Sequence, residues 1–450
     1  MLAAAPHLDA VLDRVDAKLE PFERVLCDLI RIPSVSANPE HARDVRRSAN
    51  AFADVLSDAG MENVDVLDVP EAHPIVCGDW LHRDGAPSML IYGHHDVQPV
   101  GREEKWLSPP FEPAIRDGRL YGRGSADDKG GILAQIAAIA ALLETAGTLP
   151  CNVRFLIEGE EEIGSVNLAR FLDAYRDRAR GDFVVLCDTP NFATGVPALT
   201  YRLRGNCLVD VSVRCLERPM HSGRGGGAVP DALQILCAMI AALRDVRFAA
   251  AAPPDPRELE SVRALPTNAF HPALLPGVEL LTNSPLEQTW LHPSITVTAL
   301  DATPVAQAAN QISDSARARI SIRTVPDMDT HRTGEQVAQA LRDAAPRGVI
   351  VETNVLGGPT WWKGDPASRA TASALRAMSR GYGRQAVLIG SGGSIGFVRP
   401  MADALPNAPC LLMGVEDPPC NAHSENESLH LGDWRSAIRA AVFLQDELSR

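Results

Sequence analysis

Residues 88–96 (SMLIYGHHD) decide the fold class, because they join a short apolar run to a cluster of polar side chains. The first five residues have no polar face, as in a strand that is buried on both sides of a sheet. Comparable runs occur at 152–157 (NVRFLI), 183–186 (FVVL), 386–389 (AVLI) and 410–413 (CLLM). Helical periodicity predicts helices at 8–31, 41–60, 128–146 and 429–449. Helices that alternate with buried strands predict an α/β layered domain.

The middle of the chain has a different pattern. Apolar and polar residues alternate at 207–214, 295–299 and 318–323, which predicts strands with one solvated face. Helices are predicted at about 231–245 and 333–345, and the Pro- and Ala-rich stretch 250–290 is predicted to be a long loop. We therefore expect an α+β domain inserted into the first one. The expected boundaries are 1–202 and 362–450 for the two parts of the α/β domain and 203–361 for the insert.

Composition limits the classes of function. A chain of 450 residues with 45% hydrophobic residues exceeds the roughly 250–300 residues of a single core, in agreement with two domains. The net charge of −14 argues against nucleic acids and anionic membranes as partners. Nine scattered cysteines without a CxxC pair predict reduced thiols and a cytoplasmic location. The first residues lack a basic signal-peptide region, and the longest apolar stretch, 131–143, is too short to span a bilayer.

Acidic and histidine side chains follow the predicted strands. His94 to Asp96 follow the first strand, Glu158 to Glu162 the second and Asp188 the third, and His423 comes after the last one. Ligand sites of α/β sheets lie at the carboxyl ends of the strands. Singly, each residue has an ordinary explanation: Asp127 as a helix N-cap, the glutamates as a solvated loop, Asp188 as a turn residue. Together they favour a metal site, and oxygen and nitrogen ligands suit Zn²⁺, Mn²⁺ or Co²⁺.

Glycine-rich segments offer a competing hypothesis of phosphate binding. Residues 223–228 (GRGGGA) match GxGxxA but do not follow a strand, and residues 390–396 (GSGGSIG) follow a strand but have the wrong spacing. No GxxxxGK[ST] segment occurs. The sequence therefore argues against a nucleotide site.

Five segments together resemble the M20 family of dinuclear metallopeptidases, in particular its carnosinase-like cytosolic dipeptidase branch. They are GHHDVQPV (93–100), LYGRGSADDKGG (120–131), EGEEEIGS (158–165), MHSGRGGG (220–227) and AHSENE (422–427). They occur in the order of the family and extend over nearly the whole chain. The resemblance implies a zinc-peptidase-like catalytic domain with an inserted, ferredoxin-like lid and dimerisation domain.

The resemblance also implies a site in the catalytic domain. His94 and Asp188 would bind one metal ion, Glu162 and His423 the other, and Asp127 would bridge both. Glu161 would act as general base, and Asp96 would orient His94 as a hydrogen-bond partner. The Asp127–Asp128 peptide bond is expected to be cis. The expected cofactors are two divalent ions per subunit, Zn²⁺ before Mn²⁺ or Co²⁺.

For the insert, the resemblance implies contacts with the substrate. His221 would reach across a homodimer to polarise the scissile carbonyl, and Arg323 would bind the substrate's terminal carboxylate. Asn310 would come from the partner's lid, and Gly393 and Ser394 would contact the substrate backbone. Three positions depart from the pattern of the relatives: His95, the pair Gly390-Ser391, and Asn310 with the residues after it. His95 could compete as a ligand or line the pocket.

The implied function is a homodimeric two-metal hydrolase, a metallo-dipeptidase. It would cleave the amide bond of dipeptides or similar small substrates with a free carboxylate, using a metal-activated bridging water and Glu161 as base. One alternative is a deacylase of N-acyl amino acids, of the acetylornithine deacetylase, desuccinylase or carbamoyl type. Another is a non-catalytic protein whose lid serves only binding or assembly.

Overall fold

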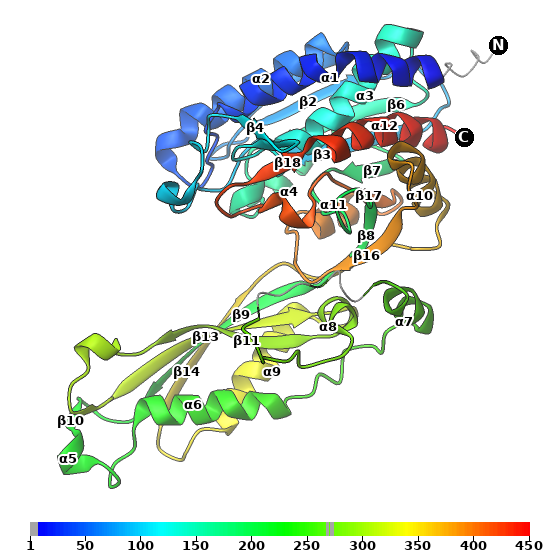
Figure 1. Cartoon of the computed structure of the whole chain (residues 1–450). Helices are drawn as coiled ribbons and strands as arrows, with labels where there is room; N and C mark the ends of the chain where they lie inside the picture. Colours follow the sequence, from blue (N-terminus) through cyan, green and yellow to red (C-terminus); the bar gives the residue numbers. More distant parts are fainter. Residues whose placement is uncertain (1–7, 267–269, 271–273) are drawn as a thin grey trace. The chain divides into compact units, whose positions relative to one another are not determined.

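A computed structural model describes residues 8–266, 270 and 274–450 (Figure 1). The chain forms two compact units. Unit 1 contains residues 1–201, 364–389 and 400–450, and unit 2 contains residues 202–363 and 390–399. The segment 390–399 therefore belongs to unit 2, whereas the sequence-based boundaries assign it to the catalytic domain. The chain passes between the units four times: within β8 (Ala198–Leu203), directly after β15 (Trp362–Lys363), within β16 (Val387–Ser391) and within α11 (Val398–Ala404).

Unit 1 is built on a mixed sheet. Its strands run in the order β1 (Glu62–Leu67), β2 (Ile75–Trp80), β6 (Asn152–Glu158), β3 (Ser88–His94), β7 (Phe183–Leu186), β17 (Cys410–Leu412) and β8. The four central strands β6, β3, β7 and β17 are parallel. A small separate sheet joins β4 (Ala114–Arg116), β5 (Arg119–Tyr121) and β18 (Ser428–His430). The predicted α/β layers are confirmed, and the carboxyl ends of β6, β3 and β7 meet at one edge.

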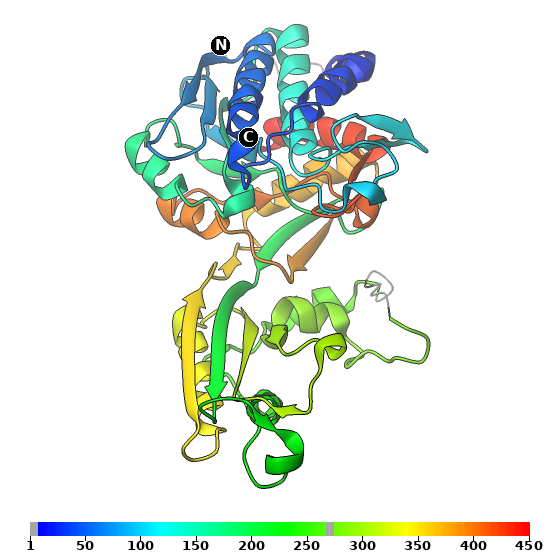
Figure 2. The ribbon, with the colours of Figure 1, turned by 90° about the vertical axis from the view of Figure 1, so that its left-hand side faces the viewer.

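Helices pack against this sheet around one large apolar cluster (Figures 1 and 2). They are α1 (Leu8–Ile30), α2 (Ala42–Asp58), α3 (Lys129–Ala146), α10 (Arg369–Tyr382) and α12 (Leu431–Leu448). Shorter helices of the unit are α4 (Leu168–Ala174) and α11 (Val398–Ala404), the second of which begins in unit 2.

Helix α3 is the central helix of this core. Every residue from Lys129 to Leu142 is buried, and the helix ends at Gly147, whose φ of 68° is readily adopted by glycine. Within the described part of the chain, α3 alone has the length and apolar composition of a membrane span. Because 78% of it is buried inside the protein, it is a core helix of unit 1.

Unit 2 contains a four-stranded antiparallel sheet with helices on one face. The strands lie in the order β11 (Ser294–Asp301), β13 (Ser315–Thr324), β9 (Gly205–Arg214) and β14 (Ile350–Gly357). Helices α6 (Ala232–Ala242) and α9 (Thr330–Asp343) share an apolar cluster with alternate residues of β9 and β13. The chain order β9-α6-β11-β13-α9-β14 is a ferredoxin-like arrangement. The predicted α+β insert is therefore confirmed, although the fourth strand was not predicted.

The Pro- and Ala-rich region of unit 2 differs from the prediction. The long loop expected over 250–290 contains two short helices, α7 (Pro256–Arg263) and α8 (Pro285–Leu291), so that expectation is wrong in part. Both begin at a proline, a residue that fits the first turn of a helix. Both are too short for an apolar periodicity to stand out in the sequence. Glu258 of α7 is buried between Arg202 and Lys363. Residues 267–269 and 271–273 of the predicted loop lie outside the described residues.

Candidate metal centre

The seven predicted residues of the catalytic domain all lie in unit 1. His94 ends β3, Glu161 and Glu162 form a 3₁₀ turn directly after β6, and Asp188 follows β7 by two residues. Asp127 lies just before α3, and His423 lies in the loop between β17 and β18. Since β6, β3 and β7 are parallel neighbours, the residues that follow them reach the same edge of the sheet.

Two groups of potential metal ligands share one carboxylate. His94, Asp127 and Asp188 form the first group, and Asp127, Glu162 and His423 form the second. The Nε2 atom of His94 lies 3.0 Å from Asp127 Oδ1 and 3.9 Å from Asp188 Oδ2. The Nε2 atom of His423 lies 2.9 Å from Asp127 Oδ2 and 3.2 Å from Glu162 Oε2. Asp127 therefore turns one oxygen toward each group, as a bridging ligand does.

These residues fit two divalent cations. The Nε2 atom of His94 is buried and has no hydrogen-bond partner that meets normal geometry, so its lone pair is available to a metal. The potential ligand atoms of each group all lie within 4.8 Å of one another, so one ion could contact every residue of a group. The donor atoms are imidazole nitrogen and carboxylate oxygen without thiolate, which suits zinc, manganese or cobalt.

Charges in the cluster are arranged to attract cations. Burial alone would lower the pKa of His94, but the carboxylates of Asp127, Asp188 and Asp96 raise it well above its usual range. Contacts with Asp127 and Glu162 raise the pKa of His423 to about 11. Burial, together with the charge of Asp127, raises the pKa of Glu162 to about 7. Positive charge is thus favoured at every one of these positions, and divalent ions would supply it.

The glutamates at the end of β6 and directly after it differ in whether their carboxylates accept hydrogen bonds from the protein. Glu158 accepts hydrogen bonds from Tyr92 and Ser165, and Glu160 accepts them from His73 N and Asn167. Glu162 faces His423. The carboxylate of Glu161 has no hydrogen-bond partner among the described residues. Burial, followed by the charge of Asp188, raises its pKa well above the usual range. Glu161 is therefore the carboxylate of the run that is free to accept a proton.

Asp96 connects the two sides of the site. The Nδ1 atom of His94 lies 3.1 Å from the backbone oxygen of Asp96 and 3.4 Å from its buried carboxylate, and this carboxylate accepts the backbone N–H of Glu161 at 3.3 Å and of Glu162 at 3.1 Å. Asp96 therefore holds the backbone of the Glu161–Glu162 turn as well as facing the ring of His94. The sequence predicted the contact of Asp96 with His94 but not its bonds to the Glu161–Glu162 turn.

His95 points away from the metal cluster. Its Nε2 atom lies 3.0 Å from the carbonyl oxygen of Pro74, its ring packs near Phe52, and the residue is completely buried. His94 is the last residue of β3, and the side chain of His95, the next residue, points to the opposite side, as successive side chains of an extended chain do. Burial lowers the pKa of His95 to about 4. The sequence left two possibilities for His95, a metal ligand or a residue that lines the pocket. Neither is correct, because His95 is part of the core.

The segment around Asp127 leaves no space for larger residues. The Asp127–Asp128 peptide bond is cis, as expected from the resemblance. Asp128 is the residue that precedes α3, so Asp127 is not the N-cap. The buried carboxylate of Asp128 lies where a side chain of Gly93 or Gly131 would project, at 2.4 and 2.1 Å from the position of a Cβ atom. Both glycines are therefore required for the close approach of β3 and α3.

Glu427 is a structural residue of the site that the sequence analysis missed. Its Oε1 atom accepts the backbone N–H groups of Ala126 at 3.0 Å and Asp127 at 3.2 Å. Its Oε2 atom accepts the N–H of Gly124 at 3.0 Å and pairs with buried Arg123 at 2.7 Å. Gln98, which donates to Glu162 Oε2 at 2.8 Å, was also missed. Glu427 and Gln98 lie within the segments 422–427 and 93–100, whose resemblance to the family could have pointed to them.

We predict that Glu427→Gln destabilises unit 1. The substitution would leave the Arg123 guanidinium, of which 1% is exposed, without its counter-charge, at a cost of about 3–5 kcal/mol. Thermal or urea unfolding of the metal-free protein measures this cost directly. Glu425→Gln is the matched control, because Glu425 pairs with the exposed Arg102 and should contribute about 0–1 kcal/mol. Equal stabilities of the two variants would contradict the role of Glu427.

The other predicted site residues all belong to unit 2. His221 pairs with Gln311 in a short ladder of β10 (Met220–His221) and β12 (Gln311–Ile312), and just beyond the ladder Ser222 N donates to Asn310 O at 2.8 Å. The side chains of His221 and Asn310 are exposed. Arg323 Nη1 donates to Ser394 Oγ at 3.0 Å, and Gly393 next to it is exposed. The structure thus joins Arg323 to Ser394 and brings the chain segments that carry His221 and Asn310 next to each other.

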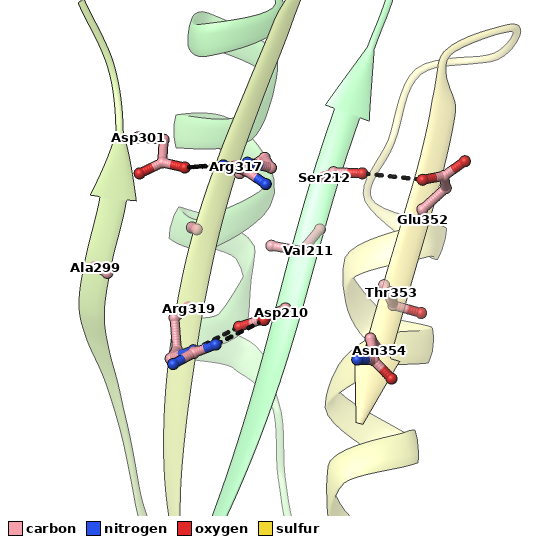
Figure 3. Close-up of a pocket in the computed structure, with 11 residues that line it drawn as sticks. Asp210, Val211, Ser212, Ala299, Asp301, Arg317, Arg319, Glu352, Thr353 and Asn354 are labelled. Atoms are coloured by element: carbon pink, nitrogen blue, oxygen red, sulfur yellow. Dashed lines mark hydrogen bonds and ion pairs between the residues drawn. The ribbon is translucent and has the colours of Figure 1, made fainter. Parts of the chain in front are cut away.

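A cavity of about 560 Å³ lies on the open face of the unit 2 sheet (Figure 3). Its charged side chains pair with each other: Arg319 with Asp210 at 2.7 Å and Arg317 with Asp301 at 2.7 Å. Ser212 donates a long hydrogen bond to Glu352. Because these charges are already paired, this face fits a solvated sheet surface better than a ligand site.

Comparison with known proteins gives matches along almost the whole chain. The pattern of Peptidase family M20/M25/M40 matches residues 90–444. A cysteinylglycine-S-conjugate dipeptidase of Corynebacterium striatum is 31% identical, over 93% of this chain and 94% of the relative. A human Beta-Ala-His dipeptidase is 27% identical, over 97% and 92%. The crystal structure of human carnosine dipeptidase 1 superposes with a TM-score of 0.83 at 24% identity, covering 99% of this chain and all of the other.

Proposed function

The chain belongs to peptidase family M20/M25/M40, and from this we propose that it is a metal-dependent hydrolase that cleaves the amide bond of dipeptides. The resemblance recognised in the sequence motifs is thereby confirmed. The single observation that carries the proposal is the pair of ligand groups that share Asp127, with the unpartnered carboxylate of Glu161 beside them. The named activities of the two relatives described above are both dipeptide hydrolysis.

In the proposed site, His94 and Asp188 would hold one cation, Glu162 and His423 would hold the other, and Asp127 would serve both. Two divalent cations, with zinc the first candidate, would supply Lewis-acid activation of a water molecule and of the substrate carbonyl. Glu161 takes a proton from the attacking water and later donates it to the leaving amine. Asp96 keeps Glu161 in place through the backbone of the turn and orients His94.

Unit 2 supplies the proposed substrate contacts. Arg323 binds the terminal carboxylate through its guanidinium, and Gly393 and Ser394 contact the backbone of the substrate. His221 donates a hydrogen bond to the scissile carbonyl. Its Nδ1 atom accepts the N–H of Gly223 at 3.1 Å, so the proton of the neutral ring resides on Nε2. An Nε2–H group is the donor that stabilises an oxyanion.

We also propose a homodimer that joins through unit 2, in the cytoplasm. Strand β11 is an edge of the sheet, and six of its eight residues are exposed, including Val297 and Leu300. Such an edge is suited to pairing with another chain. In this arrangement His221 and Asn310 serve the site of the partner. All nine cysteines are free, as is usual in a reducing compartment.

Mixing two inactive variants tests the action of His221 across subunits. We expect His221→Ala and Glu161→Gln homodimers to be nearly inactive. In a heterodimer, the site of the His221→Ala chain has an intact Glu161 and receives an intact His221 from the Glu161→Gln chain. The other site lacks both residues. Random exchange should therefore restore about a quarter of the wild-type activity. Activity of the mixture no greater than that of the separate variants would show that His221 acts within its own subunit or not at all.

A substrate panel tests the proposed function itself. The protein, reconstituted with Zn²⁺, Mn²⁺ or Co²⁺, is assayed on dipeptides with a free amine and on their N-acetyl and N-succinyl counterparts. We expect hydrolysis of the free dipeptides with the higher kcat/KM. Preference for the acylated compounds would identify a deacylase instead. Binding without hydrolysis of any amide would identify a protein that uses the site only for binding.

A further inference from the structure

Arg204 of unit 2 is a buried cation without a carboxylate partner. It follows β8 and is 8% exposed. Its Nε atom donates to Gly392 O at 3.1 Å, and its Nη1 atom donates to His292 O at 3.2 Å and Ser294 Oγ at 3.3 Å. All three acceptors are neutral, and Nη2 has no hydrogen-bond partner among the described residues. Arg202, two residues earlier and also buried, pairs instead with Glu258 at 3.2 Å.

Arg204 is coupled to Arg323 through one serine. The hydroxyl of Ser394 donates to the backbone oxygen of Arg204 at 2.6 Å and accepts from Nη1 of Arg323 at 3.0 Å. Arg323 also has no carboxylate partner in the described parts of the chain. The guanidinium of Arg204 contacts Gly392 and that of Arg323 contacts Ser394, so both cations lie against the segment 392–394, and neither has a carboxylate partner among the described residues.

The charge at this place is unfavourable without an anion. Burial, together with the charges of Arg323 and Arg202, lowers the pKa of Arg204 to about 10. Burial also lowers the pKa of Arg323. Buried charges are normally paired, so an arrangement that keeps two cations together is expected where an anion binds.

The fold holds the segment 392–394 against Arg204. A Cβ atom on Gly392 would lie 3.1 Å from Nη2 of Arg204, so the backbone of this segment lies directly against the guanidinium. The Nε donor fixes the carbonyl of the same residue. Gly393 and Ser394, which follow, are the residues proposed to contact the substrate. The position of that segment therefore depends on Arg204.

We infer that Arg204 is a positioning residue of the carboxylate-binding site, which holds the segment 392–394 and adds the second positive charge that selects free carboxylates over neutral amides. This inference rests on the proposed function, in which Arg323 binds the terminal carboxylate of the substrate. It extends the site from one guanidinium to two. The substrate class it favours is small peptides with an uncapped, negatively charged carboxyl end.

Kinetics with a matched pair of substrates tests the inference. The wild type, Arg204→Gln and Arg204→Lys are assayed on one dipeptide and on its C-terminal amide. We expect Arg204→Gln to lower the ratio of kcat/KM for acid over amide by about tenfold, through KM for the acid, because the variant loses one of the two positive charges that the acid meets. Arg204→Lys keeps the charge and should retain most of the ratio.

Arg319→Gln is the control for a lost arginine in unit 2, since Arg319 pairs with Asp210 on the exposed sheet face. It should leave the ratio unchanged. If Arg204→Gln lowers kcat/KM on acid and amide by the same factor, Arg204 has a structural role only and the inference is overturned.

A binding measurement keeps the test independent of turnover and of the folding of Arg204→Gln. Acetate and acetamide are titrated into the wild-type protein labelled with ¹⁵N-arginine, and Arg204→Lys and Arg323→Lys assign the two Nε–H resonances. We expect acetate, and not acetamide, to shift both resonances with one saturation curve. A shift of Arg323 alone, or of neither, would overturn the inference. Joint shifts in a protein that hydrolyses no dipeptide would refute the proposed function and leave the anion site standing.

Discussion

Replacement of Glu161 by glutamine is expected to lower kcat by about 10²–10⁴-fold, the contribution of a positioned general base, while the protein stays folded and binds its metal ions. Glutamine has nearly the same shape but cannot accept the proton of the attacking water. Glu161 has no hydrogen-bond partner among the described residues, so the exchange takes an acceptor away from none of their donors. The same lack of a partner makes a structural contribution of this side chain small.

Steady-state kinetics and metal analysis of the same preparation are the measurements. Glu160→Gln is the matched control, because it removes the same charge one residue earlier from a carboxylate that binds His73 and Asn167. We expect kcat of that control within about threefold of the wild type, since Glu160 does not face the cluster. Wild-type kcat in Glu161→Gln would remove Glu161 from the role of base.

Replacement of Asp127 by alanine is expected to have the largest effect on metal content. Its two oxygens serve both ligand groups, so both groups lose a ligand and the negative charge between them. We expect bound metal to fall from two ions per chain to fewer than one, and kcat/KM to fall by about 10³-fold or more, because Lewis-acid assistance is worth several kcal/mol.

Asp188→Ala is the comparison that makes this test specific. Asp188 belongs to the first ligand group only, so its loss should release one ion and leave the second group, Asp127, Glu162 and His423, intact. Metal content is measured by mass spectrometry after dialysis against metal-free buffer. If Asp127→Ala retained as much metal as Asp188→Ala, Asp127 would not be shared by two ions.

The sequence predicted the features that depend on local pattern. Buried strands at 88–92, 152–157 and 183–186 were correctly located, and parallel pairing of these strands explains why His94, Glu162 and Asp188 reach one edge. The opposite directions of His94 and His95 follow from the extended backbone at the end of β3, and this alternation could have been used to assign His95 to the core from the sequence.

Features that depend on contacts between distant parts of the chain were not predictable in the same way. Glu427 binds the backbone of residues 124–127 some 300 positions earlier, and no pattern near either segment reports that contact. The short helices α7 and α8 are specified by packing and by ion pairs such as Arg263 with Glu287 at 2.8 Å. Helices of seven or eight residues carry too few apolar positions for periodicity to reveal them.

The strand order of unit 1 has a consequence for the biosynthesis of the protein. Strand β17 lies between β7 and β8, yet the ribosome makes it only after all of residues 202–363. Until then, the nascent chain has β7 and β8 without the strand that joins them, and it lacks both His423 and Glu427. The four strands of the unit 2 sheet lie within residues 205–357 and are therefore all made before β17. The metal centre becomes complete only after the late segment 410–430 has been made and β17 has joined the sheet.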